Sequence, residues 1–425
     1  MNSRSLLLAA LLLAACGPGG TPPVDVVALI FNPETGRYEP RQVQLKTPTD
    51  LVAMKGPLLE LYGDASFNYD TSDPALANAG NDPAKISEAM TKDEGSDVKV
   101  AYIDRQGILV PADFHSLNIV TSYYNFERAF DFFAGIGGLS AESFGKRKVY
   151  YFPEFKFRGK TLQDNALFFP PMQSFMILPF EAYKQVPFAI NLGIVGHEYS
   201  HAVINYRLFD ADPLPRVFEA WYSDVFPTPG LNLLKSIDEG FADLFGTGVT
   251  CSSSFLTCDT GFMAHSVPDN IASSRRIDGI HCMSKELSDA LNSQTTESFT
   301  DASNEYRIGS VFASSLWRAA EDTTVVQKLT LGEARRQVFE GAFKALGEGS
   351  SGIRGLIANA TNLQSNFRLD SGAAARGVLD VIVESMTDPA LKSAVCSAFA
   401  DRFDMPLRWM PSCPETAAPF TDCKR

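Results

Sequence analysis

The stretch Gly196-His197-Glu198-Tyr199-Ser200-His201 decides how this chain of 425 residues is interpreted. It lies in a mainly apolar run from Phe188 to Tyr206, preceded by Pro187, which predicts a largely buried helix. Residues four positions apart share one face of a helix, so His197 and His201 can present their imidazoles to one metal ion. Because two neutral imidazoles suit Zn²⁺, the HExxH spacing predicts a zinc site on this helix.

The same spacing assigns a role to Glu198. Next to the first histidine, its carboxylate can reach a water molecule at the metal and act as general base. The alternative is a helix that carries paired histidines and no metal. The neighbouring apolar residues argue against a fully exposed helix, and polar side chains without partners would be costly inside it.

A second motif follows the first: Ser236-Ile237-Asp238-Glu239-Gly240-Phe241-Ala242-Asp243. Glu239 is the candidate third metal ligand. Asp243, one helical turn later, is placed to accept the other ring N–H of a ligand histidine. The alternative is a capping box, in which Ser236 and Glu239 only satisfy the N-terminus of a helix.

The residues His197, Glu198, His201, Glu239 and Asp243 together resemble the motifs of thermolysin-like and fungalysin-like gluzincin metallopeptidases. The resemblance covers roughly Ala112 to Trp317. It implies an α+β, zincin-type fold of two lobes: an N-terminal lobe with a β-sheet and the HExxH helix, and a mainly helical C-terminal lobe. It also implies a Zn²⁺ cofactor and a peptide or protein substrate that is bound in extended form in the cleft between the lobes.

Weaker matches extend the resemblance. Asn165-Ala166 resembles the pair on the edge strand that binds the substrate backbone in those enzymes. Tyr306 stands where the fungalysin pattern has the histidine that stabilises the transition state. A neutral phenol can donate a hydrogen bond to an oxyanion, whereas Arg307 is rotated by about 100° around the helix. We therefore expect Tyr306, rather than Arg307, to have this role.

The departure at Tyr306 also supports a different function. A catalytically silent zinc-binding envelope lipoprotein would keep the metal ligands and use the cleft for recognition. A structural lipoprotein without any metal would require both motifs to be accidental.

The N-terminus predicts export. Arg4 precedes an apolar run, Leu6 to Leu13, that is too short to span a bilayer, and residues 1–15 are expected to be a signal peptide. Leu13-Ala14-Ala15-Cys16 resembles the bacterial lipobox, which implies lipidation at Cys16 and a location in the bacterial cell envelope; Gly17 favours the outer membrane by analogy. Residues 16–23 are expected to be a flexible tether. The alternative is an ordinary cleaved signal peptide.

The composition narrows the classes of function. Lys plus Arg number 37 and Asp plus Glu 50, a net charge of -13, which disfavours nonspecific attraction to nucleic acid or to anionic lipid. Six cysteines remain besides Cys16, and in an oxidising compartment they predict three disulfides. Cys251 with Cys258 is the easiest local pair, and Cys413 with Cys423 is a candidate clamp on the tail. A zinc knuckle is the rival interpretation, but the chain has no CxxC pair.

Patterning divides the mature chain into three regions. Residues 24–110 are expected to form a small β-rich region, residues 111–210 the N-terminal catalytic lobe, and residues 211–425 the helical C-terminal lobe. The predicted strands are 24–31, 38–45, 97–104, 148–152 and 173–180, with a long loop over 64–96. The predicted helices are 112–134, 188–206, 236–247, 303–321, 331–346, 375–387 and 389–402.

Overall fold

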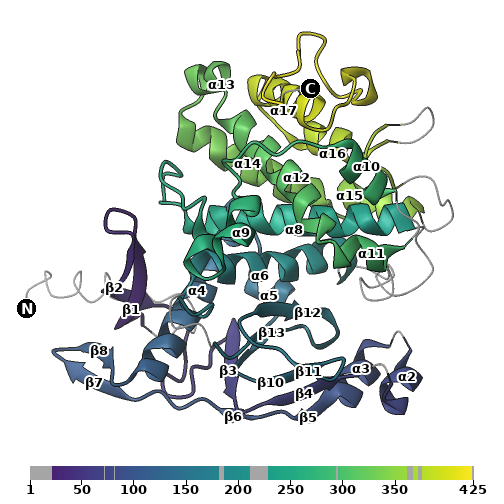
Figure 1. Ribbon diagram of the computed structural model, residues 1–425. Coiled ribbons are helices and arrows are strands. Elements are labelled where there is room, and N and C mark those ends of the chain that lie inside the picture. Colours follow the sequence, from purple (N-terminus) through teal and green to yellow (C-terminus); the bar gives the residue numbers. More distant parts are fainter. Residues whose placement is uncertain are drawn as a thin grey trace, which may run out of the picture.

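The computed structural model describes residues 22–423 except 71, 81, 181–185, 211–227, 293–294, 361–366 and 372–375. It is an α+β protein, with several small sheets in the first half of the chain and helices in the second (Figure 1). The predicted signal peptide, Cys16 and nearly all of the tether lie outside the described residues. Within the described part, no helix is both long and apolar enough to cross a membrane.

The strands form three sheets, ordered β2-β1-β8-β7, β11-β10-β4-β5 and β12-β13-β9-β3-β6. Their bounds are β1 (Val24–Asn32), β2 (Arg37–Leu45), β3 (Leu59–Gly63), β4 (Ser66–Tyr69), β5 (Thr91–Asp93), β6 (Ser96–Asp97), β7 (Tyr102–Arg105), β8 (Ile108–Pro111), β9 (Arg147–Tyr151), β10 (Glu154–Phe157), β11 (Lys160–Thr161), β12 (Ala166–Phe169) and β13 (Ser174–Ile177).

The chain also forms helices, most of them in its second half and on the other side of the molecule from the sheets (Figure 1). They are α2 (Pro74–Ala79), α3 (Pro83–Met90), α4 (Phe114–Gly137), α5 (Ala141–Phe144), α6 (Leu192–Asn205), α8 (Thr228–Thr250), α9 (Asp269–Ala272), α10 (Lys285–Leu291), α11 (Thr296–Asp301), α12 (Asn304–Ala320), α13 (Thr323–Lys328), α14 (Leu331–Leu346), α15 (Gly352–Ala360), α16 (Val378–Ser385) and α17 (Pro389–Arg402). Short 3₁₀ turns are η1 (Pro170–Met172), η3 (Phe262–His265), η4 (Ser273–Arg275) and η5 (Leu407–Trp409), and η2 (Tyr206–Asp210) is a π-helical turn that continues α6.

Several predicted elements differ from the structure. The predicted strand 97–104 is divided between β6 and β7, and the helix predicted at 236–247 is the longer α8. The loop over 64–96 is wrong, because this segment contains β4, α2, α3 and β5. Asp73 and Asp82 cap α2 and α3 with their side chains, and a proline follows each cap at the first helical position, so short helices form in a polar sequence. The HExxH helix begins later than predicted, at Leu192, because the side chain of Asn191 caps it by accepting the N–H groups of Gly193 and Ile194.

The edge strand β12 lies beside the HExxH helix α6. β12 pairs with β13 in antiparallel register, with Phe168 opposite Phe175, and β13 runs parallel to β9. Since β12 ends the five-stranded sheet, one side of its backbone is not used by the sheet. This arrangement places an open strand edge along α6.

Helices α6, α8 and α12 pack closely, and glycines at their crossings make this possible. A Cβ added at Gly246 of α8 would lie 2.9 Å from the carbonyl oxygen of Gly193 and 3.2 Å from Cβ of His197 on α6. Gly240 and Gly309 face each other where α8 crosses α12, and a Cβ on Gly309 would lie 2.8 Å from the backbone nitrogen of Gly240. The α6–α8 crossing brings His197 and His201 next to Glu239 and Asp243.

All six described cysteines are paired. Cys251–Cys258 confirms the predicted local loop, and the other pairs are Cys282–Cys423 and Cys396–Cys413. The predicted pairing of Cys413 with Cys423 is therefore wrong. Asp401 accepts the backbone N–H groups of Asp422 and Cys423, which carries the tail past α17 towards Cys282.

Candidate metal centre

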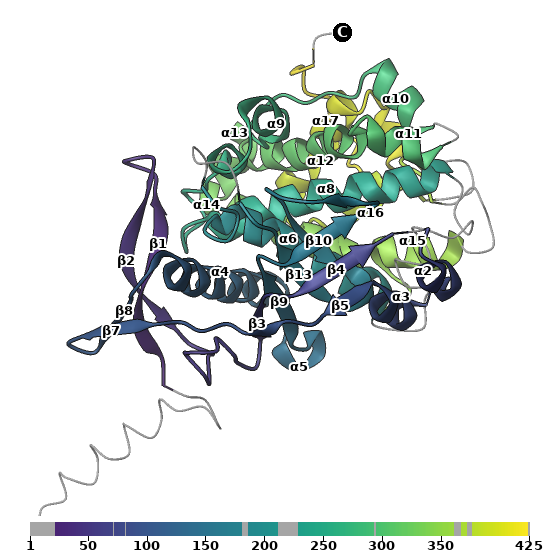
Figure 2. The ribbon, with the colours of Figure 1, turned by 60° about the horizontal axis from the view of Figure 1, so that its bottom comes forward.

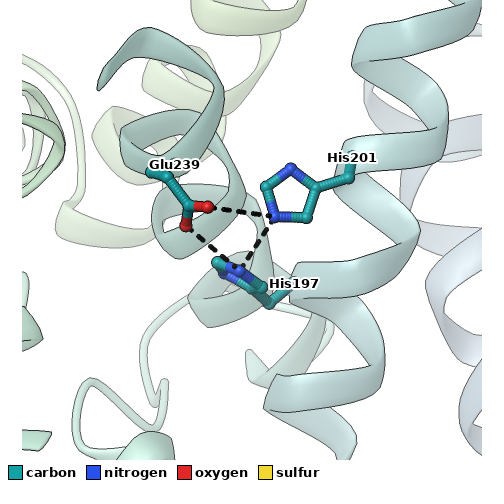
Figure 3. Close-up of side chains that lie close together, drawn as sticks. All are labelled: His197, His201 and Glu239. Atoms are coloured by element: carbon teal, nitrogen blue, oxygen red, sulfur yellow. Dashed lines mark hydrogen bonds and ion pairs between the residues drawn. The ribbon is translucent and has the colours of Figure 1, made fainter. Parts of the chain in front are cut away.

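Three side chains from two helices converge on one point (Figure 3). His197 and His201 lie one turn apart on α6, and Glu239 faces them from α8. The two Nε2 atoms are 3.0 Å apart. Oε2 of Glu239 is 3.5 Å from Nε2 of His197, and Oε1 is 3.8 Å from Nε2 of His201. A buried cluster of this composition can bind a metal ion.

The chemistry of the donors fits a cation. Nδ1 of His197 and Nδ1 of His201 each face a carboxylate, so a neutral ring carries its proton on Nδ1. The lone pairs of the two Nε2 atoms then point towards each other. Asp238, Glu239 and Asp243 surround the two rings with carboxyl groups, and Arg275 pairs with Glu239 and Asp243. The facing lone pairs and these carboxyl groups favour a cation between the three candidate ligands.

Besides Glu239, each histidine faces one other carboxylate, which orients its ring. Nδ1 of His197 lies 3.0 Å from Oδ1 of Asp243, as the sequence predicted for this residue. Nδ1 of His201 lies 3.0 Å from Oδ2 of Asp238, a partner that was not predicted. Such carboxylates fix the ring orientation and the tautomer of a ligand histidine.

Burial and charge act differently on the two rings. His197 is 4% exposed, and burial lowers its pKa although Asp243 opposes the shift. Burial acts in the same direction on His201, but Asp238 and Glu239 outweigh it and raise the pKa to about 10. Burial also raises the pKa of Glu239. The pKa of Asp243 is lowered, because Arg275 and His197 outweigh the effect of burial.

The capping-box alternative for Glu239 is wrong. Helix α8 begins at Thr228, so Ser236 and Glu239 both lie within it rather than at its N-terminus. The hydroxyl of Ser236 donates to the backbone carbonyl of Asn232, at 2.9 Å, and is not a helix cap. The carboxylate of Glu239 is free to face the histidines.

Arg275 completes the cluster and was not predicted. Arg275 is the last residue of η4. Its guanidinium donates two hydrogen bonds to Asp243, at 3.0 and 2.7 Å, and one to Glu239, at 3.1 Å. It also lies over the ring of Tyr306, 4.4 Å from the ring centroid. Arg275 belongs to no local motif, so only the tertiary structure reveals this role.

Glu198 lies beside the ligands and is held by the edge strand. Its Oε2 accepts the backbone N–H of Phe168 in β12, at 2.9 Å. Burial raises the pKa of Glu198 to about 7, although His201 and the Phe168 N–H oppose the shift. A carboxyl group with a raised pKa next to a candidate metal site suits proton transfer near neutral pH.

The predicted substrate-binding pair lies at the same edge. Ala166 is the first residue of β12, and Asn165 precedes it and accepts the Ala166 N–H with its side chain. Because the Phe168 N–H points to Glu198 and not to β13, the backbone groups of Ala166, two residues earlier, face the same side. The structure thus places Asn165 and Ala166 on the open edge next to Glu198.

Tyr306 and Arg307 differ in their surroundings. Tyr306 is close to Glu239, whose charge raises the pKa of the phenol, with burial adding to the shift, so the phenol stays protonated. Arg307 lies at the exposed rim, where it pairs with Glu286 and donates to the side chain of Asn304, both at 3.1 Å. Tyr306 is therefore the nearer of the two to the metal ligands.

One cavity of about 760 Å³ joins these groups. Its lining includes residues of β12, α6, α8 and the first turn of α12. All of the predicted metal-binding and catalytic side chains, together with Asn165 and Ala166, line it, and Asp243 supports them from behind. A volume of this size accommodates several residues of an extended peptide.

No model of a protein family matches this chain, and no curated protein matches it.

Proposed function

We propose that this chain is a zinc metallopeptidase of the gluzincin type with a zincin-type, two-lobe fold. The observation that carries the proposal is the convergence of His197, His201 and Glu239 with Glu198 beside them, in a cavity edged by an open strand. Two imidazoles and one carboxylate are the ligand set of several catalytic zinc sites, and they leave a coordination position for water. When bound, Zn²⁺ supplies a Lewis acid that polarises the scissile carbonyl and lowers the pKa of the attacking water.

Separate residues then bind the peptide and transfer the proton during hydrolysis. An extended peptide adds to the open edge of β12, where the backbone groups of Ala166 and the side chain of Asn165 pair with it. Glu198 takes a proton from the attacking water and passes it to the leaving amine. The Phe168 N–H keeps the carboxylate aligned between these two positions.

The half-buried Tyr306 stabilises the developing negative charge by donating its phenolic proton as a hydrogen bond. Its hydroxyl group remains protonated because Glu239 and burial raise its pKa. Arg275 stacks against the same ring and supplies a fixed positive charge to the site. Tyr306, supported by Arg275, takes the place of the histidine that the gluzincin families have at this position.

A second function deserves a test because of that replacement. A silent binding protein would keep the metal and the cavity and would cleave nothing. Metal analysis of the purified protein, followed by digestion of casein and of a peptide library with and without a chelator, separates the two. Stoichiometric zinc with chelator-sensitive cleavage supports the peptidase; stoichiometric zinc without cleavage supports the binding protein.

We further propose that the protein is held at a membrane of the bacterial cell envelope by lipid at Cys16. The support is the sequence Leu13-Ala14-Ala15-Cys16. One acyl chain binds membranes only marginally, so stable anchoring requires several. The Cys16→Ser protein should move to the soluble envelope fraction, and unchanged partitioning into membranes would refute the anchor.

A further inference from the structure

The sheet β2-β1-β8-β7 has one face against the core and one face towards solvent. Helix α4 packs on the sheet, and Val26 and Ala28 of β1 are completely buried on that side. Because side chains alternate along a strand, Val27 and Leu29 point the other way. Figure 2 shows the sheet at the margin of the molecule, with α4 on its inner side.

The register assigns the neighbouring strands to the same two faces. Leu109 of β8 pairs with Val26 and packs against the core, so Ile108 and Val110 lie on the outer face. Ile103 of β7 pairs with Val110 and shares that face. The outer face, defined here as Val27, Leu29, Ile103, Ile108 and Val110, is thus a continuous surface of branched aliphatic side chains.

This surface is exposed in the structure. Ile103 is 49% exposed, the other four residues are half-buried, and none of the five packs against the main hydrophobic core. Ile103 is one of eight exposed large apolar side chains among the described residues. Exposed apolar side chains gathered in this way mark an interaction surface.

Two features identify the kind of partner. Arg105, on the same side of β7 as Ile103, and Lys99, just before β7, are exposed and form no ion pair with the described residues, while Asp25 is the acidic residue on this face of β1. Basic residues around an apolar surface suit an anionic lipid headgroup layer. These two basic residues outnumber the one acidic residue, in a chain whose net charge is -13.

The second feature is the position of β1. Only Gly17 to Pro23 separate Cys16 from Val24, the first residue of β1, and at about 3.5 Å per residue this segment reaches on the order of 25 Å. A chain anchored at Cys16 therefore keeps this sheet near the bilayer.

We infer that the outer face of this sheet rests on the membrane surface and inserts its aliphatic side chains among the lipid headgroups. The inference depends on the proposed lipid anchor. It orients the protein, because the cavity between β12, α6 and α12 belongs to a different part of the molecule and stays open to the aqueous phase.

A single-site fluorescence label tests this orientation. All six other cysteines are in disulfides, so Ile103→Cys in the full-length lipidated protein adds one reactive thiol for an environment-sensitive dye. Arg105→Cys gives a second position on the same face, and Ile280→Cys, at a residue 65% exposed near α10, is the matched control. The proteins are reconstituted into phosphatidylethanolamine–phosphatidylglycerol vesicles that contain a spin-labelled lipid.

We expect blue-shifted emission and several-fold stronger quenching for the dyes at Ile103→Cys and Arg105→Cys than for the dye at Ile280→Cys. Equal quenching at all three positions, in proteins that float with the vesicles, would overturn the inference and leave the anchor intact. Failure of the proteins to float would refute the anchor itself. A blue shift that grows with protein concentration in the absence of vesicles would show that a second copy covers the face, and would also overturn the inference.

Discussion

Nδ1 of His201 lies 3.0 Å from Oδ2 of Asp238, the residue directly before the candidate ligand Glu239 on α8. The helix that supplies the third ligand therefore also orients the second histidine. Asp243 does the same for His197 one turn later. A single helix thus sets the ring orientation of both histidines, and its carboxylates should control the affinity for metal.

We expect Asp238→Ala to lower the affinity for zinc by about 10- to 100-fold, because the ring of His201 loses its hydrogen-bond acceptor. Asp238→Asn keeps an acceptor and should retain most of the affinity. Competition with a fluorescent zinc chelator measures both, and Asp289→Ala, which removes an exposed carboxylate paired with Lys285, is the control. Equal affinities in all of these variants would show that Asp238 does not support the metal site.

The neutral phenol of Tyr306 should matter for turnover more than the exposed guanidinium of Arg307. Loss of one hydrogen bond to a developing oxyanion costs about 10²- to 10³-fold in kcat, so Tyr306→Phe should show this loss with zinc content and KM little changed. Arg307→Ala should have a much smaller effect. An inactive Arg307→Ala protein beside a fully active Tyr306→Phe protein would reverse the assignment.

The contact between α6 and α8 at Gly246 should tolerate no side chain. Gly246→Ala places a methyl group 2.9 Å from the Gly193 carbonyl oxygen and should lower the free energy of unfolding by about 1–3 kcal/mol, with a loss of metal affinity. Gly135→Ala is the matched control, because its Cβ meets no neighbour and a helical alanine gains about 0.5–1 kcal/mol over glycine. Denaturant unfolding compares the two, and a stabilised Gly246→Ala protein would contradict the packing argument.

The three disulfides should differ in their contribution to stability. Cys282–Cys423 joins residues 141 positions apart, and Cys251–Cys258 joins residues 7 apart. In the chain-entropy model the longer loop contributes about 5 kcal/mol and the shorter one about 2 kcal/mol. Replacing each pair by serine should rank the unfolding midpoints in that order. Peptide mapping without reduction should also recover the three pairs, and a Cys413–Cys423 peptide would contradict them.

Sequence patterns predicted the elements that carry strong periodicity. The helices at 331–346 and 389–402 and the strands at 24–31 and 38–45 lie where the apolar spacing placed them. The segment 64–96 was predicted to be a loop because it is rich in Asp, Asn, Gly, Ser and Lys and has few large apolar residues. In the structure Asp73-Pro74 and Asp82-Pro83 begin α2 and α3, whose few apolar residues, such as Ile86 and Met90, are enough to bury one face of a short helix.

In the candidate site, too, the sequence predicted the residues that depend on local spacing and missed those that depend on tertiary packing. His197, His201, Glu198, Glu239 and Asp243 follow from helical spacing, which is a local property. Arg275 and the Phe168 N–H reach the cluster through tertiary packing, and no short motif specifies a contact of that kind.

The central claim is that Glu198 transfers the proton while Glu239 binds the metal, and one paired measurement tests it most directly. Zinc content and peptide hydrolysis are measured together for the parent protein, Glu198→Gln and Glu239→Ala. The account predicts that Glu198→Gln keeps near-stoichiometric zinc and loses nearly all hydrolysis, while Glu239→Ala loses both. Undiminished zinc in Glu239→Ala, or hydrolysis at the parental rate in Glu198→Gln, would contradict it.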